Sequence, residues 1–537
     1  MLHVGTVTVK ARARVGARCT LAPGAVVGKD AEVAPGSYVA GVVPSGEYWS
    51  GAPAERVADR ARGPWKGEST SPGDGAWLGA YGALAWLIAT LPAIALALGA
   101  LVLLPAARGA GSLGEAVGEG WSWLPVAALV SYGSLAVLIV LLVRVLGAGM
   151  REGHVPVRSG TGVRIWGTLR VLDEARTWLF PLYSSALTPT WLRLLGARVG
   201  EGVEASTVLL IPRFTTIGDH AFLADDTLVG CYELGGGWMR VAHVKIGKRA
   251  FVGNSGMAAP GRKVPKESLV AVLSAAPARE DAKARSSWVG SPPTRLRRSA
   301  ASGDDSRTYA PPVRLRVARG AFELLRVVPM LVLAFLVAGV AVAIGALLQE
   351  ALWLAVVLAG PVLLLAGLLG AAVSTLTKWL LVGRHRTGDH PLWSSFVWRN
   401  ELADTFTEVI AAPWFAAPAH GTVALNVWLR SLGARIGRGV WIDTYWLPET
   451  DLVTLEDGST VNRGCVVQTH LFHDRVLSMD AVTLKAGATL GPNSVILPAA
   501  TIGRHATVGP VSLVMRGEGV PSRTCWIGNP IGPWEAL

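Results

Sequence analysis

Length and composition argue against a small soluble enzyme. The chain has 537 residues, of which only 16% are charged, a mean hydropathy of +0.41 and a formal net charge of +12. A chain of this length can hold several domains, and its apolar excess predicts that part of it lies in a membrane. The basic residues gather beside apolar segments, with no basic face interleaved with aromatic residues, which argues against nucleic-acid binding.

Four apolar stretches are long enough to cross a bilayer, which takes about 20 residues. They cover 76–104, 121–147, 322–348 and 351–382. Short connections with little positive charge join them in pairs, so we predict two transmembrane hairpins, at 76–149 and 322–382. Basic residues such as Arg151 and Arg314 flank the outer ends, and the positive-inside rule then places those ends in the cytoplasm of an inner-membrane protein. Lys378, near the end of the last stretch, is expected to extend to the membrane interface.

A repeat of about 238 residues organises the rest of the chain. The segment Trp191-Leu-Arg-Leu-Leu-Gly-Ala-Arg returns as Trp428-Leu-Arg-Ser-Leu-Gly-Ala-Arg, and a Trp-x-Gly-x-Pro motif occurs at 49–53, 288–292 and 526–530. Self-similarity at a fixed period indicates one architecture used several times. Each unit ends in the motif, and a membrane hairpin follows the first two copies.

Within each unit an aliphatic residue recurs at every sixth position. Examples are Val9, Val15, Leu21, Val27, Val33 and Val39 in the first unit and Leu484, Leu490, Ile496, Ile502, Val508 and Val514 in the third. A period of six predicts a solenoid with one short strand per hexad and three hexads per coil. We therefore predict left-handed parallel β-helix domains at 1–57 (partial), 176–296 and 408–537. The apolar segments 176–195 and 408–432 are expected to form interfacial helices at the bilayer.

His470 is the residue most suited to catalysis. The hexads are interrupted after Val467 and after Val229, and His470 stands where the third unit runs into the predicted loop. Loops on a rigid scaffold commonly carry chemistry, and a histidine with an ordinary pKa of about 6.5 can act as a general base. His473 would point to the other side of an extended chain, so no metal site is expected. The four cysteines show no metal or disulfide spacing.

On these residues the third unit resembles the hexapeptide-repeat acyltransferases. The resemblance implies that His470 is the catalytic base and that Trp526, Gly528 and Pro530 lie beside the pantetheine arm of the acyl donor. It also implies that Asn462 lies near the acceptor, and the loop residues Gln468, Asp474 and Arg475 are further candidates there.

A closer resemblance covers almost the whole chain. Tandem β-helices alternating with membrane hairpins, and Gln468-Thr-His-Leu-Phe-His-Asp-Arg in the last copy, resemble the C-terminal half of the epsilon-poly-lysine synthetase family of membrane nonribosomal peptide synthetases. That family implies amide formation from an aminoacyl group on a phosphopantetheine carrier. Adenylation and carrier domains would act in cis or in trans, because Met1 opens partway through the first β-helix.

The other two units are expected to be silent. Tyr232 takes the place of His470 in the second unit, and the first has no histidine in its hexads. Three copies in one chain suggest a covalent pseudo-trimer in which silent copies form walls of one working site.

Two alternatives remain open from the sequence. One is a membrane acetyltransferase that uses acetyl-CoA, since the hexads do not distinguish between the two donors. The other is a non-catalytic scaffold in which all three β-helices serve as docking surfaces for partners.

Overall fold

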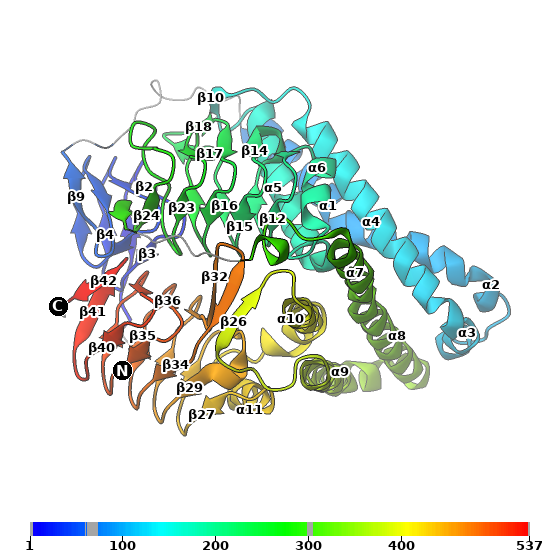
Figure 1. The fold of residues 1–537 in the computed structure, drawn as a ribbon. Helices are drawn as coiled ribbons and strands as arrows, with labels where there is room; N and C mark the ends of the chain where they lie inside the picture. The colour runs from blue at the N-terminus through cyan, green and yellow to red at the C-terminus, as the bar shows by residue number, and fades with distance from the viewer. Residues whose placement is uncertain (1–3, 60, 62–73, 298–303, 535–537) are drawn as a thin grey trace.

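The computed structural model describes residues 4–59, 61, 74–297 and 304–534; residues 1–3 of the predicted first domain lie outside it. Three parallel β-helices lie together on one side of the molecule, and the long helices extend from the other side (Figure 1). The predicted fold class, hexapeptide-repeat β-helices alternating with helical hairpins, is confirmed.

Most hexads form a strand of two or three residues, and hexads one coil apart pair in parallel. In the third β-helix, Val461 pairs with Leu490, and Leu490 pairs with Val508 one coil further on. All three side chains are fully buried because the strands stack in register and place every sixth residue inside. The period of six therefore corresponds to one side of the coil, and three hexads complete a coil.

The strands of each β-helix have the following bounds. The first β-helix contains β1 (Thr8–Val9), β2 (Arg14–Val15), β3 (Thr20–Leu21), β4 (Val26–Val27), β5 (Glu32–Val33), β6 (Tyr38–Val39), β7 (Val42–Val43), β8 (Tyr48–Ser50) and β9 (Glu55–Ala58). The second contains β11 (Arg198–Val199), β12 (Glu204–Ala205), β13 (Leu209–Leu210), β14 (Thr215–Ile217), β15 (Phe222–Leu223), β16 (Leu228–Val229), β19 (Val244–Ile246), β20 (Phe251–Val252), β21 (Met257–Ala258), β22 (Lys263–Val264), β23 (Leu269–Val270), β24 (Ser287–Val289) and β25 (Thr294–Leu296). The third contains β27 (Arg435–Ile436), β28 (Trp441–Ile442), β29 (Val453–Leu455), β30 (Thr460–Val461), β31 (Val466–Val467), β34 (Val482–Leu484), β35 (Thr489–Leu490), β36 (Val495–Ile496), β37 (Thr501–Ile502), β38 (Thr507–Val508), β39 (Leu513–Val514), β40 (Gly519–Val520), β41 (Cys525–Gly528) and β42 (Ile531–Pro533).

The interruptions of the hexads are β-hairpins. In the third β-helix, β32 (His470–His473) pairs with β33 (Val476–Met479), which also pairs with β26 (Gly388–Pro391). The second β-helix repeats this sheet with β17 (Tyr232–Gly235), β18 (Trp238–Val241) and β10 (Gly153–Pro156). The strands β10 and β26 directly follow the membrane helices. Each β-hairpin is therefore held between its β-helix and the pair of membrane helices that precedes it.

Four helical segments in the described residues are long and apolar enough to cross a membrane: Gly75–Ala107, Leu113–Gly147, Val313–Glu350 and Leu352–Leu381. They contain α1 (Asp74–Ala100), α2 (Leu104–Ala107), α3 (Leu113–Gly120), α4 (Leu124–Gly147), α7 (Val313–Glu323), α8 (Val327–Glu350) and α9 (Leu352–Leu381). Four such helices are predicted from the sequence; the first three extend beyond the predicted stretches, and the fourth is slightly shorter than the predicted 351–382. Lys378 at the end of α9 departs from expectation, because it is buried and lies 2.7 Å from the Asp451 carboxylate.

Shorter helices connect the membrane helices to the β-helices. They are α5 (Gly160–Trp178), α6 (Thr188–Leu195), α10 (Ser395–Phe406), a π-helix (Thr407–Ala416) and α11 (Val423–Ser431). α5 and α10 begin before the predicted segments 176–195 and 408–432. Their first turns carry polar residues, which a search for apolar segments leaves out. Ser159 and Ser394 cap these two helices.

The three β-helices contact one another in a ring. Arg18 of the first donates to Asp226 of the second at 2.9 Å. Asn254 of the second donates to Gln468 of the third at 2.9 Å, and Asn493 of the third donates to Thr20 of the first at 2.9 Å. The chain thus forms a covalent pseudo-trimer.

Candidate active site

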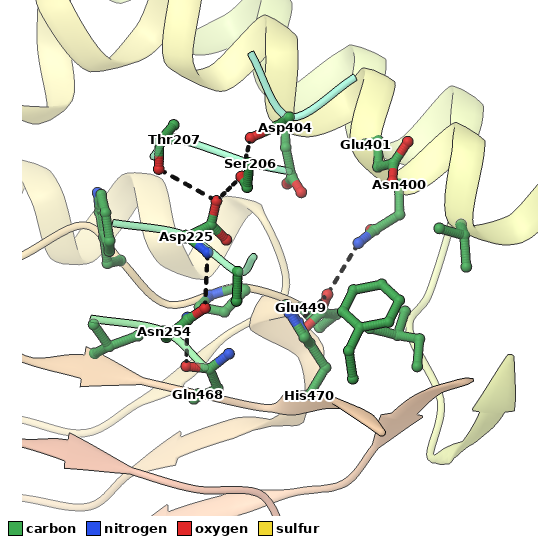
Figure 2. Close-up of a pocket in the computed structure, with 18 of the residues that line it drawn as sticks. Ser206, Thr207, Asp225, Asn254, Asn400, Glu401, Asp404, Glu449, Gln468 and His470 are labelled. Carbon is green, nitrogen blue, oxygen red and sulfur yellow. Dashed lines mark hydrogen bonds and ion pairs between the residues drawn. The ribbon is translucent and has the colours of Figure 1, made fainter. Parts of the chain in front are cut away.

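A cavity of about 280 Å³ lies where the second and third β-helices meet α10 and the π-helix. The second β-helix contributes Asp225 and Asn254, the third contributes His470 and Gln468, and α10 contributes Asp404 (Figure 2). The cavity is therefore built by two copies of the repeat and the helices that precede the third. Neither β-helix could form it alone.

His470 and Glu449 form a hydrogen-bonded pair in this cavity. Nδ1 of His470 lies 2.8 Å from a carboxylate oxygen of Glu449, whose side chain has no exposed surface. Thr469 donates to the same carboxylate at 2.7 Å, and Asn400 of α10 donates to its other oxygen at 2.9 Å. The carboxylate is fully engaged, which fixes the imidazole and directs its other nitrogen, Nε2, away from Glu449.

The pair shifts the pKa of both groups. Burial alone would lower the pKa of His470, but the charge of Glu449 and the hydrogen bond to it raise that pKa above its ordinary value. Burial alone would raise the pKa of Glu449, but the charge of His470 and the hydrogen bond lower it to about 2. Glu449 is thus ionised throughout the neutral range, and His470 is a stronger base than a free histidine.

The side of the cavity opposite His470 is acidic. Burial raises the pKa of Asp404 and of Glu408 to about 7. Ser206 and Thr207 donate to Asp225, and Tyr445 donates to Glu408 at 3.0 Å. The Asp404 side chain is exposed to the cavity and accepts no hydrogen bond from another described residue. This arrangement suits a positively charged group.

The structure brings only some of the predicted loop residues to the cavity. Gln468 lines it, held by Asn254. Asn462 is directed elsewhere and donates to the carbonyl oxygen of Leu490 at 2.7 Å. Asp474 and Arg475 form the tip of the hairpin, both with positive φ.

The Arg475 side chain contacts other parts of the chain. Its guanidinium lies 4.7 Å from the centre of the Tyr309 ring and donates to the carbonyl oxygen of Thr308 at 3.3 Å. It also donates to the carbonyl oxygen of Gly202 in the second β-helix. These contacts anchor the hairpin tip to the neighbouring copy.

The predicted donor-binding residues Trp526, Gly528 and Pro530 are not among the described residues that line this cavity. They lie at the junction of the three Trp-x-Gly-x-Pro motifs. A side chain at Gly528 would approach the Ala52 carbonyl oxygen at 3.2 Å, and one at Gly290 would approach that of Asn529 at 2.6 Å. Both glycines have positive φ, so the motif uses glycine for a close approach between copies.

The second copy keeps the backbone frame of the site and carries other side chains on it. Tyr232 pairs with Val241 at the hairpin base, as His470 pairs with Met479. The predicted equivalence of Tyr232 and His470 is therefore correct. Ile211 precedes the 3₁₀ turn Pro212–Phe214 where Glu449 precedes Thr450–Leu452, so the carboxylate is missing as well.

Sequence reasoning missed Glu449, Asn400 and Asp404. None of them belongs to a hexad, and all precede His470 in segments between the membrane helices and the coils. Comparison of the two copies could have found Glu449, because a buried isoleucine, Ile211, stands in its place in the second copy.

Comparison with known proteins agrees with this architecture. The chain is 32% identical to a delta-poly-L-ornithine synthetase of Acinetobacter baumannii (strain AB307-0294) over 99% of its own length. The predicted resemblance to a poly-amino-acid synthetase is confirmed. The chain spans about 41% of the length of that relative.

Solved structures of hexapeptide-repeat acetyltransferases also match. One from Vibrio cholerae, complexed with acetyl coenzyme A, is 16% identical and covers 21% of this chain and 76% of its own, with a TM-score of 0.19. Serine acetyltransferase from Neisseria gonorrhoeae is 16% identical and covers 31% of this chain and 55% of its own, with a TM-score of 0.19. No family model matches the chain.

Proposed function

We propose that the chain is a membrane-bound acyltransferase module that forms amide bonds in nonribosomal peptide synthesis. The donor is an aminoacyl group held as a thioester on a phosphopantetheine carrier, and the acceptor is an amine. The observation that carries this proposal is the His470–Glu449 pair in a cavity between two β-helices. Similarity to a synthetase whose name specifies a poly-amino acid supports the amide product.

In the proposed reaction the amine nitrogen attacks the thioester carbon. His470 accepts the amine proton at Nε2, since Nδ1 is engaged by Glu449. The C–N bond forms as the C–S bond breaks, and the leaving thiolate takes up a proton, so the products are an amide and the free carrier thiol. Glu449 stays ionised and stabilises the imidazolium that forms transiently.

The acidic wall suggests the class of acceptor. Asp404 and Asp225 lie close enough to His470 to raise its pKa by their charges. An acceptor with a second ammonium group, such as a diamino acid or an oligomer of one, would place that group against the unpartnered Asp404 carboxylate. The relative's name, which specifies ornithine, agrees with such an acceptor.

The membrane helices would hold this site at the inner face of the cell membrane. Arg144 and Lys378, at the β-helix ends of α4 and α9, follow the positive-inside rule with the β-helices in the cytoplasm. Adenylation and carrier domains, in cis or in trans, would supply the thioester there. Labelling of Cys19 or Cys525, both half-buried, by an impermeant thiol reagent in right-side-out and inverted vesicles would test this orientation.

The function is tested by offering two donors in parallel. The full chain in nanodiscs would be given an ornithyl carrier thioester or acetyl-CoA, with ornithine as acceptor, and products would be identified by mass spectrometry. We expect the dipeptide amide from the carrier thioester. Product from acetyl-CoA alone would indicate a free acetyltransferase, and no product from either donor would favour a scaffold.

A further inference from the structure

A chain of hydrogen bonds continues from the catalytic pair toward the membrane. Asn400 donates to Glu449 at 2.9 Å, and the Asn400 carbonyl oxygen lies 2.9 Å from Nε2 of His385. Nδ1 of His385 lies 2.8 Å from a carboxylate oxygen of Asp451. The same Asp451 oxygen lies 2.7 Å from Nζ of Lys378, in the last turns of α9. The chain joins His470 to a membrane helix through groups that are buried or nearly so.

The direction of these hydrogen bonds fixes the charge of His385. Glu449 can only accept, so Asn400 must present its NH₂ group to Glu449 and its oxygen to His385. Both ring nitrogens of His385 then face acceptors, because the Asp451 carboxylate accepts as well. His385 must therefore donate from both nitrogens as an imidazolium. Its pKa agrees, since the hydrogen bond to Asp451 and the charge of Glu449 raise it despite burial.

The second copy lacks most of these polar groups. The strands β10 and β26 and the capping residues Ser159 and Ser394 place the two copies in register. Apolar residues stand at most of the equivalent positions: Val143 for Lys378, Met150 for His385, Ile165 for Asn400 and Ile211 for Glu449, with Arg213 for Asp451 and Tyr232 for His470. Those four apolar residues are buried, so the fold packs at these positions without polar groups.

We infer that Asn400, His385 and Asp451 are positioning residues that hold the His470–Glu449 pair and attach it to α9. This inference rests on the proposed function, because it assigns a role to the base in that reaction. Burying polar residues costs free energy unless they are fully paired, and the second copy packs buried apolar residues at the positions of Asn400 and His385. In the third copy these residues keep the Glu449 carboxylate fixed and ionised beside His470.

Substitutions taken from the silent copy test the inference without overpacking the site. Asn400→Ile and His385→Met introduce residues that occupy the equivalent positions in the second copy. Asn400→Ile removes the Asn400 donor from the buried Glu449 carboxylate and leaves His470 and Thr469 as its partners. Asn426→Leu is the matched control, because Asn426 is buried and donates to the Val440 carbonyl oxygen at 2.8 Å outside the network.

The measurement is amide formation by the full chain in nanodiscs, with kcat and KM determined separately. We expect each network variant to lower kcat by about 10- to 100-fold with little change in KM, a part of the 10²- to 10⁴-fold that a general base supplies. The conservative variant His385→Gln should recover part of the loss, because it keeps a donor for one neighbour. The Asn426→Leu control should keep the kcat of the unsubstituted chain.

A second readout separates failure of this inference from failure of the proposed function. Carbethoxylation of His470 by diethyl pyrocarbonate, followed by mass spectrometry, reports its protonation without any turnover. If Asn400→Ile frees Glu449, the pKa of His470 falls, a larger fraction of its imidazole is neutral at pH 7, and modification becomes faster. An unsubstituted chain that makes no amide would refute the proposed function alone. Network variants with unchanged kcat and unchanged modification of His470, or with losses no larger than those of Asn426→Leu, would overturn the inference.

Discussion

Glu449 places a fully buried carboxylate 2.8 Å from Nδ1 of His470, and it does so from a backbone conformation with φ of +40°. Few residues other than glycine adopt that conformation without cost. The surrounding contacts hold it: Thr469 and Asn400 both donate to the carboxylate. Strain at this position accompanies an interaction that orients the candidate base.

Replacing Glu449 by Gln removes the charge and keeps the shape. We expect kcat to fall by at least about 10²-fold, because an amide can donate to Nδ1 and would then favour the tautomer that carries its proton on Nε2. Steady-state kinetics of amide formation would measure the loss. Glu456→Gln, in the same β-helix and bonded to the backbone of Ala486, is the control. Equal activities in the two variants would show that Glu449 has no part in the reaction.

The rate should rise with pH through a midpoint above about 6.5, the ordinary pKa of histidine. A base must be neutral to accept a proton, and Glu449 raises the pKa of His470, so protonation persists to higher pH than in a free histidine. Glu449→Gln should move the midpoint down, since it removes the main cause of the raised pKa. The pH profile of kcat at saturating amine would test both statements, and a midpoint below 6.5 in the unsubstituted chain would contradict them.

Asp404→Asn should weaken the binding of doubly basic acceptors. Loss of the carboxylate should raise KM for ornithine by about tenfold, which corresponds to about 1.4 kcal/mol of binding free energy. KM for a simple monoamine should change little, because its nitrogen is the one that reacts. Asp457→Asn, on an exposed turn of the third β-helix, is the matched control. An equal effect on both classes of amine would remove Asp404 from acceptor recognition.

Tyr232→His should not restore activity to a chain that carries His470→Ala. The second copy has Ile211 where the third has Glu449, so a histidine there would have no carboxylate partner and no raised pKa. Assaying the double variant for amide formation tests this. Activity above that of His470→Ala alone would show that a histidine at the hairpin base suffices.

Much of the fold could be predicted because it is periodic. Leu490 and Val508 pair one uninterrupted coil apart, and the apolar helices are long enough to cross a bilayer. The position of His470 followed from the break in that period. A regular pattern makes its interruptions visible.

The partners of His470 could not be predicted in the same way. Glu449 lies 21 residues before it, and Asn400 and His385 precede the third β-helix entirely. Their meeting depends on how α9 and α10 pack against the coil, which no local period records. Trp526, Gly528 and Pro530 lie where the three copies meet, and their role beside the acyl donor stays a prediction.

The most direct test of the account is a single-turnover assay with stoichiometric ornithyl carrier thioester and saturating ornithine. His470→Ala would be compared with His473→Ala, which changes the half-exposed histidine at the other end of the same strand. We predict that amide formation falls by about 10²- to 10⁴-fold in His470→Ala and stays near that of the unsubstituted chain in His473→Ala. Equal rates in all three proteins would contradict the assignment of His470 as the base.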